Sequence, residues 1–249
     1  MEYVQLKNEE GITVVTLQKG KVNPINEKVA EELTETFESL AGDDSAGAIV
    51  LTGNGKFFSF GLEVPELYHY SKEDFERFLI KFTNLYNVIF NHPKPVIAAV
   101  NGHAVAGGCM LAIACDYRIM TIGKAKISLN EVTFGSSVFA GSTEILKHVT
   151  GNRNAEEILF SGLMYTAEQA KQLGLVDEVI AEEEFSTRLM SLAKEFKAKD
   201  AVAYTSLKKL LRQDILEKID NYEMDSIKEF INIWYSESTR AQLKKIVIN

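Results

Sequence analysis

Residues 95–109 read Pro-Val-Ile-Ala-Ala-Val-Asn-Gly-His-Ala-Val-Ala-Gly-Gly-Cys, and this stretch indicates the fold class. Its apolar part, Pro95–Val100, has the composition of a strand buried on both faces, as in a parallel sheet. The loop Asn101–Gly107 then leads into the helical stretch Gly108–Ala114. At a helix start, free N–H groups and the helix dipole favour an anion, so Gly107-Gly108 marks a candidate anion site. Such a glycine pair also serves close packing, so it does not identify a function by itself.

An earlier part of the chain repeats this arrangement. Ala48–Leu51 is again a short, continuously apolar run, and the glycine-containing loop Phe57–Glu63 follows it. Glycine permits a sharp turn or the close approach of a ligand to the backbone. Active sites of open α/β sheets gather at the ends of such strands. The two loops together therefore predict one active site.

Strands and helices alternate along the first part of the chain. Residues 3–18 are expected to form two strands around a turn, and Asn26 is expected to cap a helix. Apolar residues at helical spacing predict a second helix at 73–90, which Pro93 and Pro95 stop. This alternation predicts βαβ units, a largely parallel sheet and the α/β fold class.

Helices dominate beyond about residue 140. The segment Thr166–Gln169 has the spacing of a capping box, and the apolar run 175–180 is the exception to the helical pattern. From about 183 to 246 the chain reads as amphipathic helix. We therefore expect an α/β core at 1–190 that holds the active site, and a C-terminal helical region at 191–249, with no linker between them.

The composition argues against several classes of function. The chain has 249 residues, a formal net charge of −8 and a pI near 5.2, which disfavours binding to nucleic acid or to an anionic membrane. Cys109 and Cys115 lack metal-ligand spacing and are expected to be buried thiols. No signal-peptide pattern and no apolar run of the roughly 20 residues that span a bilayer is visible, so a cytoplasmic protein is expected.

Four segments carry a resemblance to one enzyme family. Along nearly its whole length, the chain resembles the enoyl-CoA hydratase/isomerase (crotonase) family. The matching segments correspond to the family's Asn-Ala-Leu-like motif, its Phe-Ser-Ala-Gly-x-Asp loop, its Asn-Gly-x-Ala-x-Gly-Gly-Gly loop and a later helix–strand signature: Asn23–Asn26, Phe58–Glu63, Asn101–Gly108 and Thr166–Asp177.

The resemblance implies a spiral ββα core, a C-terminal trimerisation region, and a homotrimer that can pair into a hexamer. It also implies that the N–H groups of Leu62 and Gly107 form an oxyanion hole for a thioester enolate. The substrate would be an acyl-CoA or an acyl carrier protein thioester, and no cofactor is expected, because coenzyme A is part of the substrate. The residues expected to contact substrate or coenzyme in or beside the matching segments are Lys21, Asn23, Ser59, Phe60, Gly61 and Gly108.

Two acid–base positions distinguish the reactions of this family. Its hydratases resemble one another in carrying two glutamates; here the first position is Met110 and the second is Glu131. Hydration is best served by two carboxylates, which hold water and pass its protons, whereas one suffices for a 1,3-proton shift from C2 to C4 of a 3-enoyl thioester. The sequence Leu-Asn-Glu131 also resembles mitochondrial-type Δ3,Δ2-enoyl-CoA isomerases, so isomerisation is the leading hypothesis. Met110 would form an apolar wall that raises the pKa of the carboxyl group.

Several departures from the family pattern leave alternatives open. Phe60 replaces a small alanine, and Ser136 and Ser137 replace a proline-glycine run; the serines are expected to cap the next helix or to bond a polar acyl group. Asn130 is expected to be a turn residue, and no metal site is expected. The alternatives are a hydratase with one glutamate, a decarboxylase acting on an acyl-CoA or acyl carrier protein thioester, and an inactive acyl-CoA-binding trimer.

Overall fold

The computed structural model describes residues 1–248, and its larger sheet has six strands in the order β1-β2-β3-β5-β7-β9. All neighbouring pairs in this sheet are parallel except β1–β2. The predicted α/β class with a largely parallel sheet is therefore confirmed. The strands are β1 (Val4–Glu9), β2 (Ile12–Leu17), β3 (Ala48–Gly53), β5 (Val96–Val100), β7 (Tyr117–Thr121) and β9 (Glu178–Ile180).

The large sheet forms where the sequence has continuous apolar runs. Strands β3 and β5 lie at its centre, and helices cover both of their faces, so their side chains are buried almost throughout. At its antiparallel edge, Glu10 and Gly11 connect β1 to β2 with φ angles of 53° and 73°. Positive φ at both central residues is the geometry of a type I′ hairpin turn, so the turn predicted within 3–18 is confirmed.

A second, smaller sheet carries the two glycine-containing loops. It consists of the parallel strands β4 (Phe57–Ser59), β6 (His103–Val105) and β8 (Ile127–Ser128), with β6 in the middle. Three times in succession the chain adds one strand to each sheet before a helix: β3 and β4 before α3 (Lys72–Phe90), β5 and β6 before α4 (Gly107–Ala114), and β7 and β8 before α5 (Ala140–Thr150). This repeat confirms the expected spiral ββα core.

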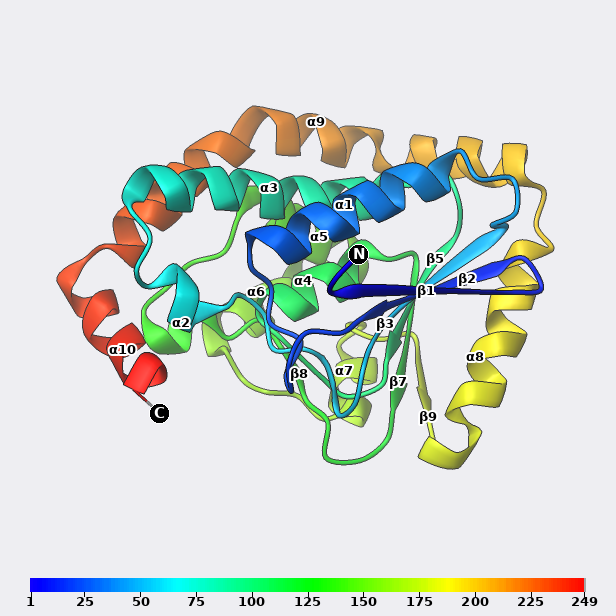
Figure 1. Ribbon diagram of the computed structural model, residues 1–249, viewed down its shortest axis with the longest axis horizontal. Coiled ribbons are helices and arrows are strands. Elements are labelled where there is room, and N and C mark those ends of the chain that lie inside the picture. The colour runs from blue at the N-terminus through cyan, green and yellow to red at the C-terminus, as the bar shows by residue number, and fades with distance from the viewer. Residues whose placement is uncertain (249) are drawn as a thin grey trace.

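Three helices lie side by side on one side of the large sheet in Figure 1: α1 (Glu27–Ala41), α3 (Lys72–Phe90) and α9 (Ala201–Trp234). The helix predicted at 73–90 is confirmed as α3. Helix α8 (Glu182–Lys197) packs on the opposite face of the sheet, where its apolar side chains form a separate cluster with residues of β2, β3, β5 and β7. The sheet therefore lies between two helical layers.

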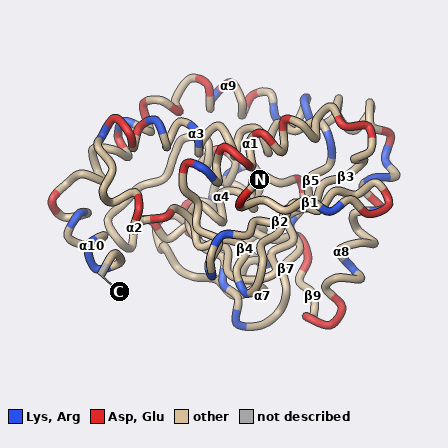
Figure 2. Tube along the Cα trace, viewed as in Figure 1, with Lys and Arg blue, Asp and Glu red and all other residues tan. Residues whose placement is uncertain are grey.

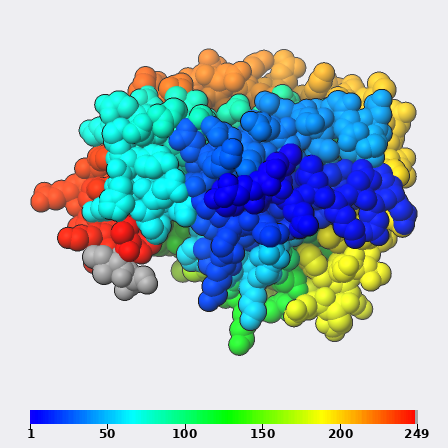
Figure 3. Space-filling model, in the orientation of Figure 1, coloured from blue at the N-terminus to red at the C-terminus, as the bar shows by residue number. Residues whose placement is uncertain are grey.

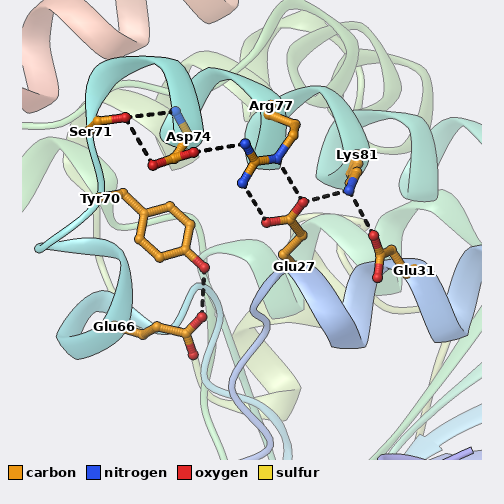
Figure 4. A network of polar contacts seen from close by, with 8 residues as sticks. All are labelled: Glu27, Glu31, Glu66, Tyr70, Ser71, Asp74, Arg77 and Lys81. Atoms are coloured by element: carbon orange, nitrogen blue, oxygen red, sulfur yellow. Dashed lines mark hydrogen bonds and ion pairs between the residues drawn. The ribbon is translucent and has the colours of Figure 1, made fainter.

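Polar contacts fix helix α3 against α1, as Figure 4 shows. Arg77 and Lys81 of α3 both bond the carboxylate of Glu27, at 3.0 and 2.5 Å. Asn26 caps α1 as predicted, because its side-chain oxygen accepts a hydrogen bond from Val29 N at 3.1 Å. The contacts of Arg77 and Lys81 therefore join α3 to the first turn of α1.

A buried ion cluster ties α9 to the core. Asp116, which precedes β7, bonds both Lys208 and Arg212 of α9 at 2.8 and 2.7 Å, and all three side chains are less than 10% exposed. The division of the chain into a core at 1–190 and a helical region at 191–249 stays a prediction. Residue 190 lies within helix α8.

The remaining helices complete the molecule around the small sheet. In Figure 3 the segment of α2 and the start of α3 lies against the C-terminal helix α10. The bounds are α2 (Val64–Leu67), α4 (Gly107–Ala114), the 3₁₀ helix η1 (Glu131–Phe134), α5 (Ala140–Thr150), α6 (Asn152–Ser161), α7 (Ala167–Gln172) and α10 (Glu237–Ile248).

The surface shows mixed charge. Figure 2 shows acidic and basic residues interspersed along the outer helices. Within residues 1–248, none of the helices combines the length and apolar character needed to cross a membrane.

Candidate active site

The three parallel strands of the small sheet end at one place, and each is followed by a predicted site residue. Strand β4 leads to Leu62, β6 to Gly107, and β8 to Glu131. Because the carboxyl ends of parallel strands share one edge of a sheet, these residues converge although they are far apart in sequence.

Close backbone contact between the first two loops positions their N–H groups. Gly61 has φ +88°, and a Cβ built on it would lie 2.8 Å from Val105 O and 3.0 Å from Gly107 N. No side chain fits there, so only glycine lets the loops touch. Ala106 also has a positive φ, 51° with ψ −121°, which turns the chain so that α4 starts at Gly107. Such strained backbone costs about 1–3 kcal/mol and is typical of functional sites.

The N–H groups of Leu62 and Gly107 have no acceptor in the described part of the chain. Among the described residues, no loop carbonyl or side chain accepts a hydrogen bond from either group. Gly107 is the first residue of α4, where helix geometry leaves the N–H free. Leu62 is held by its neighbours, because Ile25 N donates to Gly61 O at 2.8 Å and Glu63 N donates to Ile25 O at 2.9 Å. Two fixed donors are therefore available to an oxyanion.

Three of the predicted substrate-contacting residues hold the loops instead of lining a cavity. Asn23 is fully buried with φ 49°, and its amide donates to Phe57 O at 2.8 Å. Ser59 Oγ donates to Asn23 O at 2.7 Å and accepts from Gly61 N at 3.2 Å. At Gly108, an added Cβ would lie 2.2 Å from Ser59 O, so this glycine permits α4 to pack on β4.

An apolar cavity of about 420 Å³ opens beside these donors. Five of the predicted site residues line it: Phe60, Leu62, Gly107, Met110 and Glu131. Lys21 is exposed and lies outside its lining, as do the buried residues Asn23, Ser59, Gly61, Gly108 and Ser136. Among the lining residues that sequence reasoning missed are the polar Asn130 and several large apolar side chains from distant segments: Phe82, Phe134, Phe139, Met164, Phe230, Trp234 and Ile246.

Glu131 is the one acidic residue in the buried part of this cavity. It begins η1, is 5% exposed, and its Oε2 atom is buried without a hydrogen-bond partner in the described chain. Burial in apolar surroundings raises the pKa of its carboxyl group to about 8, although its own backbone N–H opposes the rise. Met110 contributes to that environment, since it lines the cavity and is only 2% exposed. The other acidic lining residue, Glu63, pairs with Lys19.

The expectation that Ser136 or Ser137 caps the next helix is wrong. Phe139 is the N-cap of α5, and Ser142 Oγ accepts the Phe139 N–H at 3.1 Å, so the cap comes from inside the helix. Ser136 Oγ is buried without a hydrogen-bond partner in the described chain, while its N–H donates to Glu131 O at 3.0 Å. Ser136 therefore supports the turn that carries Glu131.

A second hollow lies away from these strand ends. It has a volume of about 640 Å³ and lies where α8 meets α9, with Lys94, Lys199 and Lys209 among its lining. Leu62, Gly107 and Glu131 do not line it, so the two N–H donors and the buried carboxyl group are not available to a molecule bound there. In residues 1–248, no group of three or more His, Cys, Asp or Glu side chains is arranged to hold a metal ion. Both cysteines are buried free thiols, as predicted.

Comparison with known proteins agrees with the geometry. The family model described as enoyl-CoA hydratase/isomerase matches residues 7–240. A putative enoyl-CoA hydratase from Thermus thermophilus is 35% identical over 84% of this chain and 82% of its own. The mouse mitochondrial enoyl-CoA delta isomerase 1 is 26% identical over 96% of this chain and 84% of its own.

Solved structures extend this likeness. The crystal structure of human mitochondrial delta3-delta2-enoyl-CoA isomerase superposes with a TM-score of 0.94 at 25% identity, covering 99% of this chain and 97% of that one. The folds agree over the whole core and the C-terminal helices, as the earlier resemblance implies. From the matching family model, the shared fold and the sequence relatives together, we conclude that the chain belongs to the enoyl-CoA hydratase/isomerase family.

Proposed function

We propose that this enzyme is a Δ3,Δ2-enoyl-CoA isomerase in which Glu131 alone carries the proton. The supporting observation is which acid–base groups line the cavity. Glu131 lies in its buried part, and Met110 occupies the position where the hydratase pattern has the first of its two glutamates. A thioether neither holds a water molecule by strong hydrogen bonds nor passes its protons.

The proposed reaction moves one proton and one double bond. The Glu131 carboxylate removes a proton from C2 of the 3-enoyl thioester, and the electron pair moves into the C2–C1 bond and onto the thioester oxygen. The N–H groups of Leu62 and Gly107 would stabilise the resulting dienolate, a role in which one donor is worth about 3–4 kcal/mol in other enzymes. The protonated Glu131 then gives the proton to C4, and the double bond forms between C2 and C3.

The pKa of Glu131 suits a base that must also become an acid. With a pKa of about 8, roughly a tenth of the enzyme carries the ionised carboxylate at pH 7, and this fraction rises with pH. A carboxylate whose pKa is raised this far is a stronger base toward the weakly acidic C2 proton than an exposed glutamate would be. We therefore expect kcat/KM to rise with pH and to level off above about pH 8.

A hydratase that works with one glutamate is the second candidate. The names of relatives favour it, since the Thermus thermophilus relative is called a putative enoyl-CoA hydratase. In that reaction Glu131 would deprotonate the attacking water. If neither substrate of the experiment below is converted, both candidates fail, and a decarboxylase or an inactive acyl-CoA-binding protein takes their place.

We propose that the protein assembles as a homotrimer. Helix α9 exposes Val202, Leu207, Leu210 and Leu211, each at least 60% exposed. A second group lies beside η1, where Val132, Phe160 and Leu163 are at least 50% exposed. Apolar patches of this kind mark protein interfaces, and two different patches on one chain suit a head-to-tail ring.

The test compares isomerisation and hydration in one assay. 3-Hexenoyl-CoA and 2-hexenoyl-CoA are mixed separately with wild-type protein, Glu131→Gln and the control Glu144→Gln. Glu144 lies outside the cavity and pairs with Lys147 and Lys218, so its variant should keep full activity. Growth of the conjugated-enoyl absorbance from the first substrate, lost only in Glu131→Gln, supports the isomerase. Loss of absorbance from the second substrate without growth from the first would establish the hydratase.

A further inference from the structure

The lining of the active-site cavity has an exposed part and a buried end. Phe60, Met164 and Ile246 line it and are 49%, 40% and 44% exposed. The large aromatic side chains of the lining are almost fully buried: Phe82, Phe139, Phe230 and Trp234. This buried aromatic end is the apolar surface along which the acyl chain of a thioester held at the two N–H groups can lie.

A row of aromatic rings forms the wall of that end. It begins next to the oxyanion donor, because a Cβ on Gly107 would lie 3.1 Å from the ring of Phe82. From Phe82 the ring centroids follow at 6.1 Å to Phe139, then 4.6 Å to Phe230, then 6.0 Å to Trp234. All four side chains line the cavity, and none is more than 3% exposed.

Trp234 is held firmly at the far end of this row. Its ring centroid lies 4.7 Å from that of Phe75, which also contacts Phe230 at 6.1 Å, and the Trp234 side chain is 1% exposed. The next residue, Tyr235, ends α9 and donates from its hydroxyl to Tyr70 O at 2.7 Å. Packing and this anchor leave the indole no room to swing aside, since interiors are close-packed.

The free volume limits what fits. The cavity has a volume of about 420 Å³, and an acyl chain that extends along the aromatic wall from Phe82 meets the buried indole of Trp234 at the end of the row. We propose that Trp234 ends the acyl cavity and sets the longest acyl chain that the enzyme accepts. This inference deepens the proposed function, because it rests on the cavity being an acyl-CoA site.

The chain supplies its own probe for this proposal. Trp234 is the only tryptophan in the sequence, so intrinsic tryptophan fluorescence reports on the wall alone. Saturated acyl-CoA esters of four to sixteen carbons are titrated into the wild-type protein, with coenzyme A as the reference. Each buried methylene adds about 0.8 kcal/mol, so affinity should rise about fourfold per carbon and stop rising at the chain length that reaches the indole. Esters that reach the indole should change its emission, and coenzyme A should not.

Two variants separate a specificity role from a packing role. The break is the acyl chain length at which affinity stops rising. In Trp234→Ala the cavity is extended, so the break, measured by calorimetry, should move to longer chains by two or more carbons. Phe37→Leu is the matched control: it shortens a fully buried aromatic residue that does not line the cavity, and the break should stay in place. Trp234→Leu is the milder substitute if the alanine variant fails to fold.

The outcomes distinguish this inference from the isomerase proposal. Affinity that keeps rising to sixteen carbons in the wild type, or an unchanged break in Trp234→Ala, would overturn the role of Trp234. No binding of any ester would overturn it too. If the break appears as expected but no enoyl ester is converted, the isomerase proposal fails and the role of Trp234 stands.

Discussion

Replacing Glu131 by glutamine should remove one large contribution to the pH dependence of this protein's stability. The carboxyl group is buried in the folded state, where its pKa is about 8 against an ordinary value of 4.5. The folded state therefore holds the proton more tightly than the unfolded state. Between pH 4.5 and 8 the unfolded chain loses that proton while the folded protein keeps it, so the free energy of unfolding falls as pH rises. Above about pH 8 both states are ionised, and the loss is complete.

The size of the effect follows from the two pKa values. At 1.36 kcal/mol for each pH unit, the interval from 4.5 to 8 corresponds to about 5 kcal/mol over the full range. Between pH 5 and pH 8 the wild type should lose about 3.5 kcal/mol through this group alone. Glutamine has nearly the same shape and does not titrate, so its cost of burial is constant with pH.

The assay is urea unfolding at pH 5, 6, 7 and 8, compared for wild type, Glu131→Gln and Glu144→Gln. Glu144 is a useful control because its pKa is lowered by Lys147 and Lys218, although its partial burial opposes this. The wild type and the Glu144 variant should lose stability relative to Glu131→Gln as pH rises. Parallel curves for wild type and Glu131→Gln would refute the argument that the buried carboxyl is protonated at neutral pH.

Three further predictions concern the site and its support. Met110→Glu places a second carboxyl group in the cavity with Glu131, and hydration of 2-hexenoyl-CoA should increase at least tenfold over wild type in the same spectroscopic assay. Gly107→Ala pushes a Cβ to 3.1 Å from Phe82, which should misplace the N–H donor and lower kcat about 100-fold with an unchanged fold by circular dichroism. Asp116→Asn leaves two buried cations without their carboxylate, and urea unfolding should show a loss of about 3–5 kcal/mol.

Local features could be predicted from the sequence because neighbouring residues decide them. Asn26 and Thr166 cap the helices that follow them, as their spacing indicates, and the helix at 73–90 is correct to within one residue. The strands of the small sheet could not be predicted, since two or three residues show no periodicity. Their approximate place followed only from the loops and from the resemblance to the family.

The candidate site could be predicted where it follows a strand end, and not where tertiary packing forms it. Leu62, Gly107 and Glu131 were found from motifs, and the structure brings them together around one cavity. Phe139 and Trp234 were missed, because nothing in the local sequence indicates that α5 and α9 meet there. The error at Ser136 has a similar cause: the chain stays extended past it, and α5 begins only after Phe139.

The central claim is that one buried carboxyl group moves the proton from C2 to C4, and isotope transfer tests it most directly. 3-Hexenoyl-CoA deuterated at C2 is converted in ordinary water, and the product is analysed by mass spectrometry and NMR at low conversion. Because Glu131 is only 5% exposed, the deuteron it removes should be shielded from solvent long enough to reach C4 in a substantial fraction of product molecules. Product that carries no deuterium at C4, even at the earliest times, would contradict transfer by Glu131 alone.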